Sequence, residues 1–252
     1  RDGTGSGNSM ADAVVDEIRS AGGQAAATYG SVTDDAAAAG MIKCAVDNFG
    51  RLDILINNAG ILRDRSFKNM TDAEWDAVID VHLRGSYLAT KHAWAQMLEQ
   101  GEGGRIIMTS STSGLIGNFG QTNYGAAKAG IAGFMRCLAL EGARAGITVN
   151  VLAPNAYSRM TADLFPEGSD VLYAAEKVSP AIAWLCSDEA ESVTGRQFVI
   201  SGNRVSLLYQ AHETIADRDG KEDAWTPSEI GEKILKSMSD WPEPASVAKL
   251  VF

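Results

Sequence analysis

The chain has 252 residues, a length that suits one large α/β domain or two small domains, and its 45% hydrophobic and 21% charged residues argue against a largely disordered protein. The net charge of −10 argues against nucleic acid or an anionic membrane surface as a non-specific partner, because either would repel the protein. Three scattered cysteines are too few for a disulfide framework or a zinc site, and no apolar run is long enough to span a membrane, so a reducing, cytoplasmic setting is the simplest expectation. The sequence starts at Arg1 without an initiating Met, so we expect a processed, trimmed or partly recorded chain.

Short apolar runs alternate with longer helical patterns along the chain. Amphipathic spacing and capping signals predict helices over residues 9–21, 33–49, 71–100, 123–145 and 177–187. Apolar runs predict strands over residues 24–32, 52–56, 105–109, 147–152 and 197–201, with Pro154 ending the fourth. Strands separated by helical segments predict right-handed βαβ units, and therefore an α/β fold with a doubly wound parallel sheet.

The last part of the chain has a different pattern. Thr226 and Glu229 form a capping signal for a helix that we expect to end near Ser239. We therefore divide the chain into a main domain, residues 1–205, and a C-terminal extension, residues 206–252, packed on the same domain. So short a segment cannot bury a sizeable core alone.

The Gly-rich start, residues 3–7, looks like a phosphate-binding loop but lacks its context. A dinucleotide loop follows a strand, so that its amides and the next helix N-terminus meet the pyrophosphate, and nothing apolar precedes Gly3. The glycine spacing also fits neither of the usual fingerprints. We predict a simple loop that leads into the first helix.

A tyrosine and a lysine four residues apart share one face of a helix, where the ammonium can stabilise a tyrosinate and lower the tyrosine pKa. Such a tyrosine can exchange a proton with a substrate hydroxyl or carbonyl. The pattern occurs three times, as Tyr87/Lys91, Tyr124/Lys128 and Tyr173/Lys177. Only Tyr124 has a hydroxyl 13 residues earlier, Ser111, just past a predicted strand, where open α/β sheets bind ligands. We select Tyr124, Lys128 and Ser111 as candidate catalytic residues and interpret the other pairs as surface helix contacts.

The run Asn57-Asn58-Ala59-Gly60 follows the predicted strand 52–56. Small residues at the carboxyl end of a parallel strand let a backbone or a cofactor approach closely, and asparagine amides can tie adjacent loops together. An ordinary Asn-rich turn would have the same residues, but the position at a strand end favours the functional interpretation.

Together these features resemble the classical short-chain dehydrogenases/reductases, on the strength of residues 57–60, Ser111, Tyr124 and Lys128, and the resemblance spans essentially residues 8–205. Finer matches resemble the subgroup that contains the (3R)-hydroxyacyl-CoA dehydrogenase unit of peroxisomal multifunctional enzyme type 2 and its stand-alone bacterial relatives. These matches lie at residues 58–67, 81–86, 117–121, 153–156 and 158–161.

The resemblance implies a role for each candidate residue. Tyr124 would be the general acid/base, Ser111 would hold the substrate oxygen, and Lys128 would hold the nicotinamide ribose and lower the Tyr124 pKa. Most members of the family carry at this position an Asn that holds a water, whereas this chain has His82, and the acyl-CoA subgroup also has a histidine there. His82 could relay a proton or be a packed helix histidine. The residues implied to line the cofactor, besides Tyr124 and Lys128, are Ser31, Val32, Asn58, Ala59, Gly60, Asn155, Ala156, Tyr157 and Thr161, and no metal is implied.

The resemblance also implies that the first βαβ unit of the family is absent from this sequence. That unit carries the Gly-rich nucleotide loop and the strand that selects NAD or NADP. Without it, the run at 52–56 would become an apolar sheet edge, and residues 24–32 would lose their partner strand. The pyrophosphate would also lack a helix N-terminus.

The function implied is oxidation of a (3R)-3-hydroxyacyl-CoA with transfer of hydride to NAD, with NADP not excluded. We expect a homodimer or homotetramer in which the helices over residues 71–100 and 123–145 pair the subunits. We expect the protein in the cytoplasm, or in the peroxisome of a eukaryote. One alternative keeps the same residues in an NADPH-dependent 3-oxoacyl-thioester reductase or a steroid or other secondary-alcohol dehydrogenase. The other is of a different class, a truncated inactive fragment or a scaffold subunit.

Overall fold

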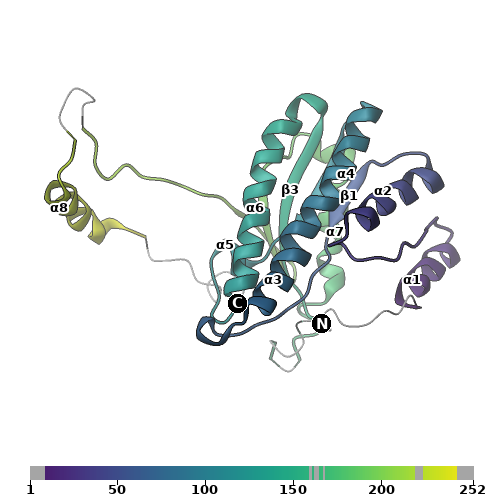
Figure 1. The fold of residues 1–252 in the computed structure, drawn as a ribbon, viewed down its shortest axis with the longest axis horizontal. Coiled ribbons are helices and arrows are strands. Elements are labelled where there is room, and N and C mark those ends of the chain that lie inside the picture. Colours follow the sequence, from purple (N-terminus) through teal and green to yellow (C-terminus); the bar gives the residue numbers. More distant parts are fainter. Residues whose placement is uncertain (1–8, 159–160, 162–164, 167, 219–223, 243–252) are drawn as a thin grey trace.

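A five-stranded sheet forms the centre of the molecule (Figure 1), and the computed structural model describes residues 9–158, 161, 165–166, 168–218 and 224–242. The strands are β1 Ile54–Asn57, β2 Gly104–Thr109, β3 Ile147–Asn155, β4 Gln197–Ser201 and β5 Arg204–Leu208, neighbours in that order. The first three pairings are parallel, and β5 runs antiparallel to β4. The predicted α/β sheet is confirmed, with an antiparallel edge strand added.

Eight helices are present among the described residues, and all but α8 lie on the same side of the long segment after β5 as the sheet. They are α1 Ser9–Ser20, α2 Asp35–Phe49, α3 Asp72–Ile79, α4 Gly85–Gln100, α5 Thr112–Leu115, α6 Thr122–Gly142, α7 Ser179–Leu185 and α8 Pro227–Ser237. A π-helical turn, Asp80–Arg84, joins α3 to α4, so the helix predicted over 71–100 is present but divided. The predicted capping signals are present as capping boxes, formed by Thr71 and Glu74 at the start of α3 and by Thr226 and Glu229 at the start of α8.

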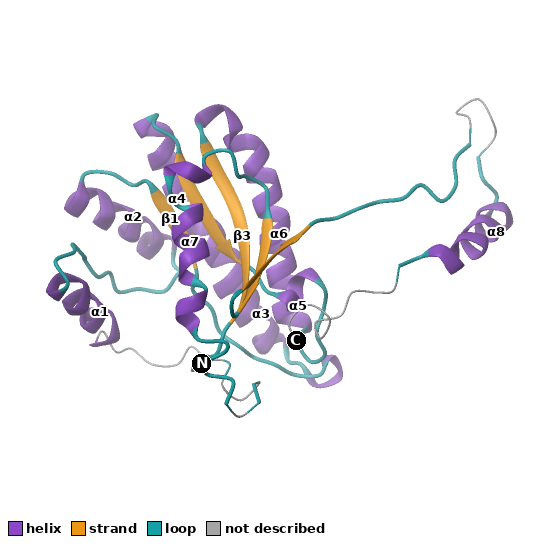
Figure 2. Ribbon diagram, turned by 180° about the vertical axis from the view of Figure 1, so that it is seen from behind, coloured by secondary structure: helices purple, strands orange, loops and turns teal. Residues whose placement is uncertain are grey.

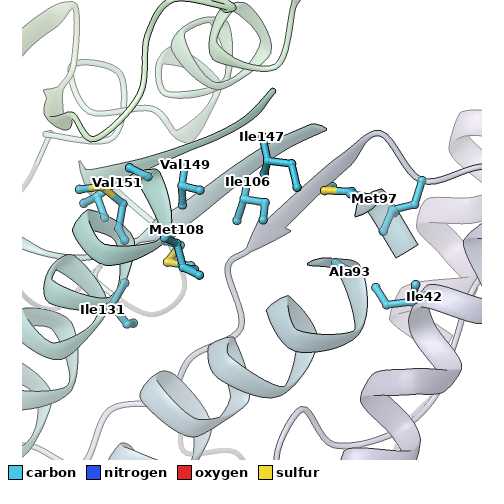
Figure 3. Packing of buried hydrophobic residues seen from close by; sticks show 13 residues of the cluster. Ile42, Ala93, Met97, Ile106, Met108, Ile131, Ile147, Val149 and Val151 are labelled. Atoms are coloured by element: carbon cyan, nitrogen blue, oxygen red, sulfur yellow. The ribbon is translucent and has the colours of Figure 1, made fainter. Parts of the chain in front are cut away.

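The strands bury alternate residues against two helical layers, because successive side chains point to opposite faces of a sheet. One buried cluster lies between the sheet and helices α4 and α6 (Figure 3) and includes Ile106, Met108, Val149, Val151, Met97 and Ile131. The cluster on the opposite face, which α7 covers in Figure 2, includes Ile107, Leu152, Ile200, Val178 and Leu185. The two clusters hold the carboxyl ends of β1, β2 and β3 at one edge of the sheet.

Three predicted elements differ from the structure in type or in extent. Residues 24–32 form a loop rather than a strand, because such a short run needs a neighbouring strand and none of the described strands pairs with it. Strand β3 continues through Pro154 instead of ending before it. Strand β2 ends opposite Leu152, so Pro154 pairs with β4 alone. The N–H that proline lacks is therefore not needed for hydrogen bonds to β2. The helix predicted over 177–187 is confined to α7.

Strand β5 is absent from the sequence-based prediction. Gly202 and Asn203 form a two-residue connection between β4 and β5, with Ser201 paired to Arg204 and Gly202 at a φ of +55°. A Gly-Asn dipeptide between two apolar runs is a hairpin signal, and it should have indicated this strand. Strand β5 also crosses the boundary expected between residues 205 and 206.

The chain beyond β5 leads to α8, which lies away from the sheet and its helices in both views (Figures 1 and 2). We expected the C-terminal extension to pack on the main domain, but in this structure α8 lies apart from it. Local contacts hold the start of the helix: Arg218 stacks 3.8 Å from the centre of the Trp225 ring and pairs with Glu229 at 3.1 Å. These contacts, with the capping box, let the helix start form without a neighbouring core.

Strand β1 is the outer edge of the sheet at the side opposite β5. Ile54 and Ile56 are 41% and 44% exposed, and among the described strands β1 pairs with β2 alone. Helix α2 packs on α4. The apolar edge predicted for residues 52–56 is thus confirmed, and such an edge is a template for pairing with another strand.

Candidate active site

The candidate residues gather where β1, β2 and β3 end. The register pairs Asn57 with Met108 and Thr109 with Leu152, so the loops that follow the three strands start side by side. Helix α6 brings Tyr124 and Lys128 to the loop after β2. The site thus lies at the carboxyl edge of the parallel strands, as the sequence predicts.

Ser111 and Tyr124 are in direct contact. Ser111 is the N-cap of α5, and its hydroxyl accepts a hydrogen bond from the Ser113 amide at 3.2 Å. The same hydroxyl is hydrogen-bonded to the Tyr124 side chain. Ser110 is buried and donates from its hydroxyl to the Lys128 carbonyl at 2.8 Å, which fixes α6 to the end of β2.

Lys128 lies beneath Tyr124 and is almost fully buried. Its Nζ donates to the Thr109 carbonyl at 2.6 Å and lies 5.4 Å from the centre of the Tyr124 ring. Burial lowers the pKa of Lys128 to about 7, because the ammonium is removed from water. A buried lysine of this kind can change protonation near neutral pH.

The pKa of Tyr124 is raised above its ordinary value, not lowered as predicted. Burial is the largest cause, the hydrogen bond from Ser111 opposes it, and the Asp64 carboxylate adds to it. In the unliganded site the Lys128 amine donates to the Thr109 carbonyl, and burial outweighs the groups that lower the Tyr124 pKa. Without further ligands, Tyr124 is a protonated phenol at neutral pH.

His82 projects from the π-helical turn into the space between the β1 loop and Tyr124. It is 2% exposed, its Nε2 lies 2.8 Å from the Ile61 carbonyl oxygen, and its ring meets the edge of Tyr124 at 5.1 Å between centroids. Burial, followed by the charge of Lys128, lowers the pKa of His82 to about 4, so the imidazole is neutral. A Cβ on Gly60 would overlap the His82 ring, which is why a glycine is required there.

Several residues expected to line the cofactor lie around a pocket of about 190 Å³. Val32, Asn58 and Ala59 line it, and Ser31 lies beside Val32 with its hydroxyl 2.8 Å from that of Thr33. The structure therefore brings the loop before α2 to the loop after β1, although the sequence separates them by some two dozen residues.

The residues expected at the nicotinamide end form the loop after β3. Asn155 donates from its amide to the Ser201 hydroxyl at 3.2 Å, and Thr161 donates from its hydroxyl to the Ala156 carbonyl at 2.6 Å. The Tyr157 amide donates to the Tyr173 carbonyl at 2.7 Å. Two residues of the motif at 158–161, Arg159 and Met160, lie outside the described residues, as does the Gly-rich run 3–7.

The two other Tyr/Lys pairs differ from Tyr124 and Lys128 in their surroundings, although Tyr173 borders the loop after β3, where its carbonyl accepts from the Tyr157 amide. Tyr87 is exposed on α4, and Lys91 contacts Asp35 at 3.6 Å. Tyr173 belongs to no helix. This agrees with the choice of Tyr124.

Within the described residues, no group of three or more His, Cys, Asp or Glu side chains could hold a metal ion. None of the described helices has the length and apolar character needed to cross a bilayer. All three cysteines are free.

The sequence model of the short chain dehydrogenase family matches residues 4–167. The chain belongs to this family. It is an oxidoreductase of the type that acts on CH–OH groups.

Known relatives support the membership. A short-chain type dehydrogenase/reductase of Mycobacterium tuberculosis is 48% identical over 208 residues, which cover 82% of this chain and 72% of that protein. Peroxisomal multifunctional enzyme type 2 of Mus musculus is 50% identical over 193 residues, 77% of this chain but only 26% of the mouse protein. A solved structure of a short chain dehydrogenase from Mycobacterium avium superposes with a TM-score of 0.84 at 42% identity, covering 94% of this chain and 82% of that one.

Short-chain dehydrogenases generally bind NAD(P), and part of the site suits such a nucleotide. The Tyr124 hydroxyl and Lys128 Nζ approach the end of β2, and the glycine at position 60 keeps the adjacent loop close to His82. Among the described residues, no glycine-rich loop joins a strand to a helix to receive the pyrophosphate. The residues therefore fit the ribose and nicotinamide end of the dinucleotide.

Sequence reasoning missed a polar group beside the catalytic candidates of this short-chain dehydrogenase. Asn123 is fully buried and donates from its amide to the carbonyls of Arg63 and Glu74 at 3.0 and 3.1 Å, while its Oδ1 accepts from the Tyr124 amide at 2.8 Å. Gln121 is also buried, with Asp64 among its partners. The signal available was two amide side chains within four residues of Tyr124 at the start of a predicted helix.

Proposed function

We propose that this protein transfers hydride between NAD and carbon 3 of a (3R)-3-hydroxyacyl-CoA, which becomes the 3-oxoacyl-CoA. The observation that carries the proposal is the contact of the Ser111 and Tyr124 hydroxyls above the buried Lys128. The substrate class rests on relatives named as peroxisomal multifunctional enzyme type 2, of which this chain spans about a quarter to a third, and on a hydroxyacyl-CoA dehydrogenase of Mycobacterium tuberculosis that is 40% identical.

Tyr124 takes the proton of the substrate hydroxyl in the oxidation direction and returns it to the carbonyl oxygen in the reverse direction. Ser111 donates a hydrogen bond to that oxygen and holds it beside Tyr124. Because the pKa of Tyr124 is raised in the unliganded site, removing a proton from the substrate requires a nearby cation, and Lys128 in its ammonium form supplies it. NAD, when bound, supplies the hydride acceptor.

His82 acts as a neutral positioning residue in this proposal. Its Nε2 is engaged by the Ile61 backbone, so Nδ1, which has no partner among the described polar atoms, is the nitrogen left to form a hydrogen bond with a water. A proton relay from Lys128 would have to pass through such a water. The packed arrangement against Gly60 and Tyr124 is the role that the contacts support most directly.

The nucleotide would be held in two parts. Lys128 and Tyr124, with the loop of Asn155, Ala156, Tyr157 and Thr161, would hold the nicotinamide and its ribose. Ser31, Val32, Asn58, Ala59 and Gly60 would lie along the adenine half. NAD is preferred over NADP because the subgroup that the sequence resembles prefers it.

We also propose that the protein is a homodimer or homotetramer paired through α4 and α6. These helices expose Tyr87, Leu98 and Leu140 to 47%, 50% and 81%. Apolar groups on neighbouring helices form a surface that a second copy would cover. The cytoplasm, or a peroxisome in a eukaryote, is the proposed compartment.

A second candidate, an NADPH-dependent 3-oxoacyl-thioester reductase, uses the same residues. It is favoured by a 3-oxoacyl-[acyl-carrier-protein] reductase of Synechocystis that is 40% identical over 208 residues, 79% of this chain and 83% of that protein. Its direction also suits the raised pKa of Tyr124, since a protonated phenol can donate to a carbonyl.

A panel of substrates separates the two. Both enantiomers of 3-hydroxybutyryl-CoA are assayed with NAD and with NADP, and acetoacetyl thioesters of CoA and of acyl carrier protein are assayed with NADH and NADPH. The proposal predicts the highest kcat/KM for the (3R) enantiomer with NAD. Equal or better turnover of the carrier-protein thioester with NADPH would replace it by the second candidate.

A further inference from the structure

A buried amide joins three loops at the mouth of the site. Gln121 is 7% exposed. Its Nε2 donates to Asp64 Oδ2 at 2.8 Å, and its Oε1 accepts from the Ser113 hydroxyl at 2.6 Å and the Asn118 amide at 3.1 Å. Both ends of the amide are therefore occupied by side chains from other segments.

The segments that meet at Gln121 come from different strands. Asp64 belongs to the loop after β1, and Ser113 to the first turn of α5 after β2, while Gln121 is the residue before α6. A bridge between Arg65 and Gln121, with the Arg65 amide donating to the Gly120 carbonyl at 2.8 Å, runs beside the side-chain contacts. The loops are thus joined by both backbone and side chain.

Ser111 is linked to the Gln121 side chain through Ser113, and Tyr124 lies in the helical turn that the Gln121 main chain begins. Ser113 donates its amide to the Ser111 hydroxyl, and its own side chain is fixed by Gln121. Gln121 also begins the first turn of α6, where its carbonyl accepts from the Gly125 amide at 2.6 Å, and Tyr124 lies in that turn. Moving Gln121 would change the position of Ser111 and of Tyr124 relative to one another.

We propose that Gln121 is a positioning residue, an amide that joins Asp64 to Ser113 and thereby fixes the Ser111 hydroxyl against Tyr124. The inference rests on the proposed function only for its effect on catalysis. Its effect on the ionisation of Tyr124 follows from the contacts alone.

Among the described residues, three titratable groups face Tyr124. Asp64 approaches from the β1 loop, His82 from the π-helical turn, and Lys128 from the same helix. Glu74 of α3 lies further out and is paired with Arg65 at 3.0 Å. Asp64 raises the pKa of Tyr124 and the bond from Ser111 lowers it, so the two ends of the Gln121 group act on Tyr124 in opposite directions.

This opposition gives a signature that a merely structural role would not produce. Asp64→Asn keeps an oxygen that can accept from Gln121 but removes the charge, so the pKa of Tyr124 should fall; the fall should be small because Asp64 is exposed and screened by water. Gln121→Leu releases Ser113 and with it Ser111, so the pKa of Tyr124 should rise. Ser113→Ala removes one contact only and should produce a smaller rise.

The measurement is a pH titration of ¹³Cζ-tyrosine resonances in the protein without nucleotide, with circular dichroism at each pH to confirm folding. The chain has 6 tyrosines, and the resonance missing from Tyr124→Phe identifies the relevant one. Gln96→Leu is the matched control, since Gln96 has its amide bonded to Gln100 on α4, away from the site. Opposite shifts in Asp64→Asn and Gln121→Leu support the inference. Unchanged titration of Tyr124 in Asp64→Asn and Ser113→Ala overturns it, even if Gln121→Leu fails to fold.

Steady-state kinetics supply the second readout. Gln121→Leu should lower kcat by about tenfold to a hundredfold, since a displacement of about 1 Å can cost that much, with the KM for nucleotide nearly unchanged. An effect on KM alone would contradict a positioning role. If the wild-type chain turns over none of the substrates but Tyr124 still titrates as predicted, the inference holds and the proposed function fails.

Discussion

Replacing Lys128 by Met should change how the stability of the protein depends on pH. Burial lowers the pKa of Lys128 from 10.5 to about 7. A shift of that size corresponds to about 5 kcal/mol of unfavourable free energy for the ammonium form in the folded protein. The side chain is 3% exposed, so water screens little of this effect.

The sign follows from proton binding. The folded pKa lies below the unfolded one, so the unfolded chain binds more protons between about pH 7 and 10.5, and the free energy of unfolding rises with pH across that window. Below pH 7 the full penalty applies. Between pH 7 and pH 9 the contribution of Lys128 should improve stability by about 2 kcal/mol, and the Met variant lacks this gain.

Urea unfolding of both proteins at pH 7 and pH 9, followed by circular dichroism, measures the difference. Other titrating groups cancel when the variant is subtracted from wild type. Lys91→Met is the control, because it removes a lysine that is exposed beside Asp35 instead of a buried one. Parallel pH dependence of wild type and Lys128→Met would refute the claim that Lys128 is a buried amine with a lowered pKa.

Three further predictions follow from the site and the sheet edge. Gly60→Ala should destabilise the protein by about 1–3 kcal/mol because its methyl group overlaps the His82 ring, and adding His82→Ala should recover part of that loss; additive effects in thermal unfolding would contradict the contact. Ser111→Ala should lower kcat by about 10²–10³-fold through loss of a donor to the substrate oxygen, while a calorimetric Kd for nucleotide stays within a factor of about two. Ile56→Lys on the open edge of β1 should leave the free energy of unfolding within about 0.5 kcal/mol and reduce aggregation in light scattering, and a larger destabilisation would mean that the edge is covered.

Much of the site could be predicted because local signals and strand topology act together. The positions of Ser111 after β2 and of Tyr124 on the following helix bring two hydroxyls to one sheet edge, and the structure puts them in contact. The capping boxes were predicted for a similar reason, since a Thr and a Glu three residues apart satisfy orphan amides within one turn.

Other features depend on tertiary contacts that no local pattern encodes. Burial of the Tyr124 phenol raises its pKa, where the sequence led us to expect that Lys128 would lower it, and the Lys128 amine donates to the Thr109 carbonyl. The π-helical turn that aims His82 at Gly60 interrupts a pattern that reads as one helix. Residues 24–32 have the composition of a weak strand, but a strand needs a partner, and the described sheet offers none beside them.

The central claim is that Tyr124 exchanges the proton of the substrate hydroxyl in a nicotinamide-dependent reaction. The most direct measurement is the rate of NADH formation at 340 nm from (3R)-3-hydroxybutyryl-CoA and NAD, for wild type and Tyr124→Phe, with thermal unfolding of both proteins in the presence of NAD. The account predicts turnover by wild type, a loss of about 10²–10⁴-fold in Tyr124→Phe, and similar protection of both proteins by NAD. Equal rates in the two proteins, or a wild-type chain that NAD neither stabilises nor reacts with, would contradict it; the second result would favour the inactive fragment or scaffold subunit.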